Sequence, residues 1–249
     1  MYEQRPGGGA SCFGSRSGIL PPTVTISLPF VAIHSTLTLT PMTHDELLAY
    51  YTAPGPFTSV GAFADQIDAL PAEAGAIARF VHGLLIHEAL APANGVVLSP
   101  ERRTEKQLHG ASAMLACAAR TDDGPLAEGR PPDRRVVGVC RHFATLFVAC
   151  LRHKGIPARA RCGFANYFQP GKNLDHWVGE YWNASEQSWI LVDAQVDEHQ
   201  AKFYKPDFDL LDVPPGPLSR RRRRLGAMPK RRRGPDDVRR RWHRQLGLD

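Results

Sequence analysis

Hydrophobic residues recur at helical spacing in three stretches of the chain. Within residues 72–90 an apolar face follows the i, i+3, i+4, i+7 and i+8 positions, and residues 102–119 carry a second apolar side. The third stretch begins at Cys140, and Gly155 and Pro157 mark its end. This periodicity predicts a helix in each stretch, since glycine commonly follows the last turn of a helix and proline prevents its continuation.

Residues beyond Pro157 change to patterns that are typical of strands. The segments 158–164, 176–182 and 188–192 are rich in apolar and aromatic residues, and 176–182 alternates between two faces. The polar residues 183–187 between the last two segments predict a hairpin turn. Helices followed by adjacent antiparallel strands indicate the α+β class.

Composition divides the chain into three parts. Residues 1–41 are expected to be a disordered leader, because 1–23 are rich in Gly, Ser, Arg and Pro. A capping box, Thr43 to Glu46, stands ahead of the apolar run LLAYY and marks the start of the folded part. The expected domain spans 42–213, and 214–249 is expected to be a basic, disordered tail.

Positive charge is concentrated at the C-terminus. Residues 219–249 hold 13 of the 31 Lys and Arg and three of the 25 Asp and Glu, so residues 1–218 carry 18 basic and 22 acidic side chains. Any nucleic-acid binding would therefore rest on this tail alone. A tail without selected function and a C-terminus read in a shifted frame are the two alternatives.

Cysteine usage and hydropathy bear on the compartment. The five cysteines are odd in number and form no CxxC pair, which argues against a disulfide framework or a zinc site. No apolar run approaches the roughly 20 residues of a membrane span. A cytoplasmic protein without a membrane partner is expected. Export is the minority alternative, because residues 24–33 make only a poor signal peptide.

Three residues at the ends of regular elements carry candidate chemistry. Cys140 opens a helix, where unpaired N–H groups and the macrodipole favour a thiolate. His176 opens one predicted strand and Asp193 closes the next. Both lie at the end of the hairpin that is distant from its turn, so an acid beside an imidazole is expected there. The three together predict a Cys-His-Asp catalytic site.

Other candidate residues have weaker support. His82 and His87 lie in the predicted helix 72–90, and a metal site is one interpretation. Positions on the helix surface are favoured, because residues five apart do not share a face well. Cys150 is expected to be buried and inert. No calcium loop of regularly spaced acids is present, and neither a metal nor another cofactor is expected.

The motifs of this region resemble those of the transglutaminase-like superfamily. The pattern comprises GVCRHF, in which the cysteine opens a helix, then GIPAR at 155–159, HWVGEY at 176–181 and WILVD at 189–193. Gly179 is a departure, because it places Glu180 one position later than in some members. The resemblance covers about residues 136–197 and implies a papain-like α+β core with the triad Cys140, His176 and Asp193.

The resemblance also implies acyl transfer from a glutamine side chain or hydrolysis of an amide in a protein or peptide substrate. In this scheme Cys140 attacks the carbonyl, His176 shuttles the proton and Asp193 holds the imidazole tautomer. The backbone N–H of Cys140 is a natural oxyanion donor. A non-catalytic binding module of the same fold and a nucleic-acid binder acting through the basic tail are the alternatives. Three tryptophans are candidate cleft residues, although packing in the sheet or core is favoured for each: Trp177, Trp182 and Trp189.

Overall fold

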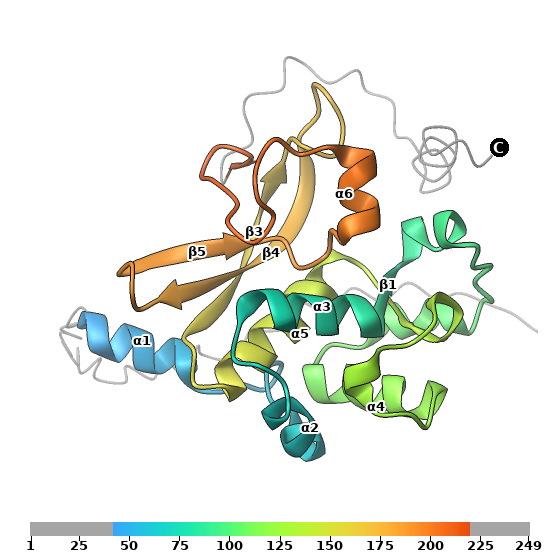
Figure 1. Ribbon diagram of the computed structural model, residues 1–249, viewed down its shortest axis with the longest axis horizontal. Coiled ribbons are helices and arrows are strands. Elements are labelled where there is room, and N and C mark those ends of the chain that lie inside the picture. The colour runs from blue at the N-terminus through green and yellow to red at the C-terminus, as the bar shows by residue number, and fades with distance from the viewer. Residues whose placement is uncertain (1–41, 220–249) are drawn as a thin grey trace, which may run out of the picture. The chain divides into compact units, whose positions relative to one another are not determined.

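The computed structural model describes residues 42–219 (Figure 1). The expected leader, residues 1–41, and residues 220–249 of the expected tail lie outside this range. The α-helices are α1 His44–Thr52, α2 Ala64–Asp68, α3 Ala74–Leu84, α4 Ala111–Thr121, α5 Cys140–His153 and α6 Glu198–Tyr204. The strands are β1 Leu85–His87, β2 Val136–Gly138, β3 Ala158–Ala165, β4 Leu174–Asn183, β5 Ser188–Val192 and β6 Leu218–Ser219.

The first helix begins at the expected capping box. The backbone N–H of Thr43 donates to Glu46 Oε2 at 2.8 Å, and the N–H of Glu46 donates to Thr43 Oγ1 at 3.3 Å. The cap satisfies donors that have no partner within the helix. None of the residues of α1 is fully buried, so this helix lies at the margin of the core.

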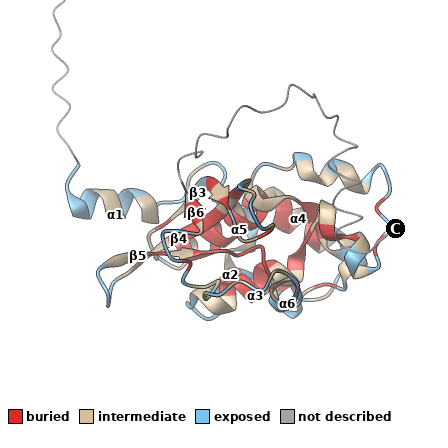
Figure 2. Ribbon diagram, turned by 90° about the horizontal axis from the view of Figure 1, so that it is seen from above, coloured by how far each residue is buried: buried red, intermediate tan, exposed pale blue. Residues whose placement is uncertain are grey.

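Helix α5 is the centre of the core, as its apolar periodicity predicts. It contacts the helices α1, α2, α3 and α4 and the strands β1, β2, β3 and β4. Nine of its fourteen residues are buried, and the helix lies in the middle of the buried part of the molecule (Figure 2). The helix ends as expected, because Gly155 adopts a φ of +74° that favours glycine.

For the two other long helices, the prediction from periodicity is wrong at one end of each helix. Residues 72–90 divide into α3, strand β1 and a 3₁₀ turn, Glu88–Leu90. Residues 102–119 divide into a 3₁₀ segment, Arg102–Gln107, and α4. In the first case strand pairing with β2 outweighs helix propagation: Leu85, Ile86 and His87 pair in parallel with residues 136–138.

The main sheet has the order β5-β4-β3-β6, and all its pairs are antiparallel. The strands expected at 158–164, 176–182 and 188–192 are confirmed as β3, β4 and β5. The β4–β5 hairpin runs from the pair Asn183–Ser188 at its turn to Gly179–Val192 at its far end. With helices packed against it, this sheet makes the fold the expected α+β class.

Gly179 has a packing reason to be a glycine. A Cβ atom at this position would lie 2.7 Å from Cε1 of Phe147, a fully buried residue of α5. The face of β4 that holds Gly179 and Tyr181 is therefore pressed against α5. The opposite face holds Val178, which packs in a separate cluster with Phe168 and Val196.

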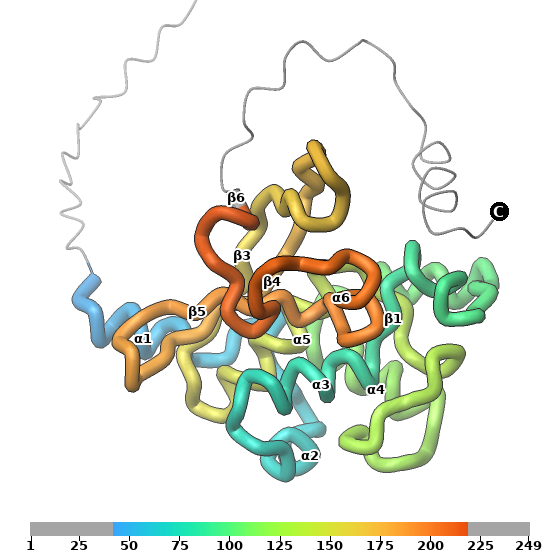
Figure 3. The backbone as a smooth tube through the Cα atoms, turned by 45° about the horizontal axis from the view of Figure 1, so that its top comes forward, coloured from blue at the N-terminus to red at the C-terminus, as the bar shows by residue number. Residues whose placement is uncertain are grey.

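The chain after α6 returns to both edges of the sheet. The N–H of Val213 donates to the carbonyl of Leu191 at 2.8 Å, beside β5, and β6 then pairs with Phe164 and Ala165 at the other edge (Figure 3). Leu218 is 8% exposed. The disorder expected from residue 214 is thus wrong for residues 214–219: their composition carries little apolar period, but the exposed edge of β3 supplies the partner.

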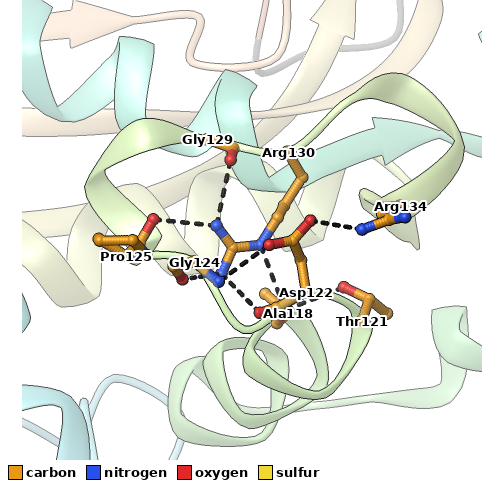
Figure 4. Close-up of polar contacts among 8 residues, drawn as sticks. All are labelled: Ala118, Thr121, Asp122, Gly124, Pro125, Gly129, Arg130 and Arg134. Carbon is orange, nitrogen blue, oxygen red and sulfur yellow. Dashed lines mark hydrogen bonds and ion pairs between the residues drawn. The ribbon is translucent and has the colours of Figure 1, made fainter.

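A buried arginine organises the loop that leads to β2. The Arg130 guanidinium donates to the carbonyls of Pro125, Gly124 and Asp122 at 2.9, 2.7 and 3.0 Å (Figure 4). Its backbone N–H donates to the carbonyl of Gly83 in α3 at 2.7 Å. Because carbonyl groups surround this charge, the loop is held in one conformation, and β2 begins at a defined point beside β1.

Candidate active site

Cys140 is the first residue of α5 and is partly exposed. Strand β2 ends at Gly138, so only Val139 separates the buried strand from the helix. The cap of the helix is built by His142, whose Nδ1 accepts the N–H of Val139 at 3.0 Å. The thiol therefore projects from a rigid junction, and the free N–H groups of the first helical turn surround it.

His176 and Asp193 meet as the hairpin predicts. The imidazole Nε2 lies 2.9 Å from Asp193 Oδ2, and both side chains are almost completely buried. The pairing of β4 with β5 ends at Gly179 and Val192, so Asp193 directly follows the last paired residue of β5 and His176 lies on the same side of that pair, away from the turn. The pairing of β4 with β5 thus brings His176 and Asp193 close together.

The electrostatics of His176 favour the protonated ring. Burial by itself lowers the pKa of His176, but the Asp193 carboxylate and a hydrogen bond with the Cys140 thiol outweigh it and raise the pKa to about 9. Because Asp193 engages Nε2, Nδ1 is the nitrogen left for the thiol. Cys140, His176 and Asp193 are therefore brought together in the order thiol, imidazole, carboxylate.

Asp193 is held as an anion by a set of donors. Burial raises its pKa, but His176, the Tyr167 hydroxyl and the backbone N–H of Gln195 together lower it below its usual range. The Tyr167 hydroxyl donates to Oδ2 at 2.7 Å, and the N–H of Gln195 donates to Oδ1 at 3.0 Å. These bonds leave the carboxylate fixed in orientation and able to hold the imidazole.

Aromatic rings complete the surroundings of His176. The ring of Phe168 meets it edge-on with centroids 4.7 Å apart, and Tyr167 does so at 6.1 Å. Tyr204 of α6 packs on Phe168 at 5.0 Å. Sequence reasoning missed these residues because they lie in a loop and a short helix without periodicity. The available signal was the aromatic pair Tyr167 and Phe168, which follows β3 after one residue.

The other cysteines differ from Cys140 in their surroundings. Cys150 is fully buried, as expected, and burial raises the pKa of its thiol to about 12, which favours the protonated thiol. Cys162 is exposed on β3, and its pKa is also raised, by desolvation and then by the nearby Cys140 and Asp175. The imidazole of His176, in contrast, forms a hydrogen bond with the Cys140 thiol.

The candidate cleft tryptophans lie mainly away from the triad. Trp182 and Trp189 pair with each other near the turn of the hairpin, with ring centroids 5.7 Å apart. The Arg159 guanidinium covers Trp189 at 3.8 Å from its centroid. Six residues of strand, about 20 Å, separate Trp182 from His176. These two rings therefore pack near the turn of the hairpin, and Trp177 directly follows His176 in β4.

A large cavity also lies apart from the triad. Its volume is about 950 Å³, and it lies between the outer face of the sheet and the segment 212–218, with Arg161, Glu180 and Lys172 among its lining residues. No group of three or more His, Cys, Asp or Glu residues in this part of the chain is placed to hold a metal ion. None of the helices described has the length and apolar character needed to cross a membrane.

The part of the chain that carries this site is similar to proteins of a known family. Residues 125–194 match the model of the transglutaminase-like superfamily. No curated protein matches the chain. A candidate cysteine protease from Cytophaga hutchinsonii has a similar structure, with 17% identity, a TM-score of 0.40, and coverage of 62% of this chain and 43% of that one. The periplasmic domain of TgpA from Pseudomonas aeruginosa shows 22% identity, a TM-score of 0.24, and coverage of 48% and 51%.

This chain thus spans about half the length, or less, of those two solved chains. The family match includes Cys140, His176 and Asp193 together with the helix and strands that carry them. The part of the chain that carries the candidate site, residues 125–194, is therefore similar to the transglutaminase-like superfamily.

Proposed function

We propose that this protein is a cysteine enzyme that transfers the acyl group of an amide through a Cys140 thioester. The observation that carries the proposal is the buried pair of His176 and Asp193, 2.9 Å apart, next to a thiol at a helix start. An imidazole held between a carboxylate and a thiol is the arrangement that activates a nucleophile and protonates a leaving group.

The reaction follows from these positions. The Cys140 thiolate forms a bond to the amide carbonyl carbon, and the carbonyl π electrons move to oxygen. As the tetrahedral intermediate collapses, the C–N bond breaks and the amine leaves with the proton of the His176 imidazolium. Water or a primary amine then gives its proton to the imidazole and attacks the thioester, which releases an acid or a new amide and restores the thiol.

A protein or peptide with a glutamine side chain or an accessible backbone amide is the proposed substrate. The cytoplasm is the proposed compartment, supported by the four cysteines of residues 42–219, all of which are free. Hydrolysis and transamidation differ only in the nucleophile that attacks the thioester, so one assay distinguishes them.

The test is incubation of the full chain with a glutamine peptide, with and without a primary amine, and with Cys140→Ala as the control. We expect the wild-type chain to release ammonia and to change the peptide mass, and the control to do neither. A backbone amidase would instead cleave a panel of peptides without releasing ammonia. A wild-type chain that labels with iodoacetamide at Cys140 but turns over no amide in either assay would identify a binding module and refute the proposal.

A further inference from the structure

His87 lies beside the junction from which Cys140 projects. It is the last residue of β1 and pairs with Gly138, the last residue of β2, two positions before Cys140. Alternate residues of a strand share a face. Leu85 packs in the core that includes α5, whereas Ile86 packs in a different cluster. The side chain of His87 therefore lies on the α5 side of β1.

The ring of His87 covers the first turn of α5. It stacks on Phe143, with centroids 6.4 Å apart and an interplanar angle of 27°. Phe143 follows Cys140 by three residues, so both lie on neighbouring parts of one helix face. His176 and Asp193 are among the charged groups that act on His87, along with Glu88 and His142. The ring thus lies in the electrostatic field of the triad.

The hydrogen bonding of His87 determines its tautomer. Nδ1 accepts the backbone N–H of Ala89 at 3.2 Å, so the ring proton of the neutral imidazole is on Nε2. Burial, followed by the positive charge of His176, lowers the pKa of His87 to about 4. The ring is therefore a neutral donor at neutral pH. Nε2–H is the one N–H donor of the neutral ring.

An acyl transfer from an amide creates negative charge on oxygen, and a site for it needs donors in place before the reaction. The backbone N–H of Cys140 is one such donor. We propose that the Nε2–H of His87 is the second and hydrogen-bonds the oxygen of the tetrahedral intermediate. The inference rests on the function proposed above. No proton is transferred from His87: it stabilises the C–O⁻ while the S–C bond forms, and releases the oxygen when the C=O is restored and the C–N bond breaks.

Two substitutions separate the two nitrogens of the ring in the full-length chain. His87→Asn places an amide oxygen near the position of Nδ1, so it can keep the bond from Ala89 but loses the donor. His87→Gln reaches farther and places an amide N–H near the position of Nε2. We expect His87→Asn to lower kcat on the glutamine peptide by roughly 10²–10³-fold, and His87→Gln to recover much of that loss.

Alkylation of Cys140 by iodoacetamide is the second readout. This displacement at a saturated carbon forms no oxyanion, so a pure oxyanion donor does not affect it. We expect both variants to be alkylated at a rate within about twofold of wild type, because the triad is intact. Wild-type kcat in His87→Asn would overturn the inference, and so would a parallel loss of turnover and alkylation, which would show that His87 only positions the triad.

The two proposals fail in different ways. A wild-type chain that is alkylated but turns over no amide refutes the proposed function, whereas a wild-type chain that turns over as fast as His87→Asn refutes the role of His87. If His87→Asn does not fold, an NMR measurement on the wild-type chain tests the role of His87.

An aldehyde analogue of the glutamine peptide forms a hemithioacetal with Cys140, and we expect the His87 ring N–H resonance to shift on its addition. If this resonance does not shift in the protein that carries the hemithioacetal, the inference is overturned.

Discussion

At the scale of single residues, the site depends on an ion pair between two buried side chains. His176 and Asp193 are 2% and 1% exposed, and each would be costly to bury as an isolated ion. Their hydrogen bond at 2.9 Å, with the further donors to Asp193, offsets this cost. The same bond determines which ring nitrogen faces Cys140, so stability and chemistry depend on one contact.

Asp193→Asn should abolish most of the turnover while the fold persists. An amide can donate to Nε2 and so favour the wrong tautomer, and we expect kcat to fall roughly 10⁴-fold, as the equivalent change does in a serine-protease triad.

Tyr167→Phe removes one donor to the Asp193 carboxylate, at 2.7 Å, and should lower kcat about tenfold. Amide turnover measured on folded variants tests both, and a folded Asp193→Asn with wild-type kcat would mean that the carboxylate is only structural.

The stability of the fold should depend on pH through His176. Its pKa rises from 6.5 to about 9 on folding. A group whose pKa is raised binds its proton more tightly in the folded state, so its stabilisation is complete below pH 6.5 and disappears as the pH rises through about 9. We expect the difference in the free energy of unfolding between wild type and His176→Gln to shrink over this interval. Urea titrations at several pH values measure it, and a constant difference would contradict the assigned shift.

At the scale of elements, α5 and the sheet are joined by an unusually close approach at Gly179. The helix can lie near β4 because this position has no side chain, and the approach fixes how far Cys140 lies from the strand that carries His176. The departure from the family motif at this position therefore has a structural cause.

Gly179→Ala should destabilise the protein. The added methyl would overlap the buried ring of Phe147, and overpacking of this kind costs about 1–3 kcal/mol. Gly216→Ala is the matched control, because no atom lies within 4 Å of a Cβ built there, and its effect should be within about 0.5 kcal/mol. Thermal or urea unfolding compares the two. Equal stability of both variants would show that α5 moves away from β4 at little cost.

At the scale of the whole molecule, the C-terminal segment closes the fold on both sides of the sheet. Val213 bonds to β5, and β6 pairs with β3, although residues from 214 onward carry the composition of a tail. The folded part therefore includes β6 and extends beyond the expected limit at residue 213.

Two truncations test this boundary. A chain ending at Val213 loses β6 and the buried Leu218, which should cost about 2 kcal/mol. A chain ending at Ser219 keeps both and removes only the basic tail, so we expect its melting temperature and Cys140 labelling to match those of the full chain. If the chain ending at Val213 were as stable as the chain ending at Ser219, β6 would contribute nothing. A loss of stability on removing the tail alone would contradict the expected disorder of residues 220–249.

The sequence by itself determined the features that depend on local periodicity. The apolar spacing after Cys140 predicted α5, and the strand patterns and polar turn predicted the β4–β5 hairpin. Strand pairing then brings His176 near Asp193 without further information, because both lie at the open end of one hairpin. For this reason, the sequence alone predicts Cys140, His176 and Asp193 as the candidate site.

Only the tertiary structure decided the features that depend on partners distant in the chain. The apolar residues Leu85 and Ile86 suit a helix or a strand equally, and pairing with β2, some fifty positions later, selects the strand and turns His87 toward α5. Tyr167 reaches Asp193 from a loop, and Leu218 is ordered by an open strand edge. Local sequence cannot specify such contacts, because their free energy arises only when segments remote in sequence have already come together.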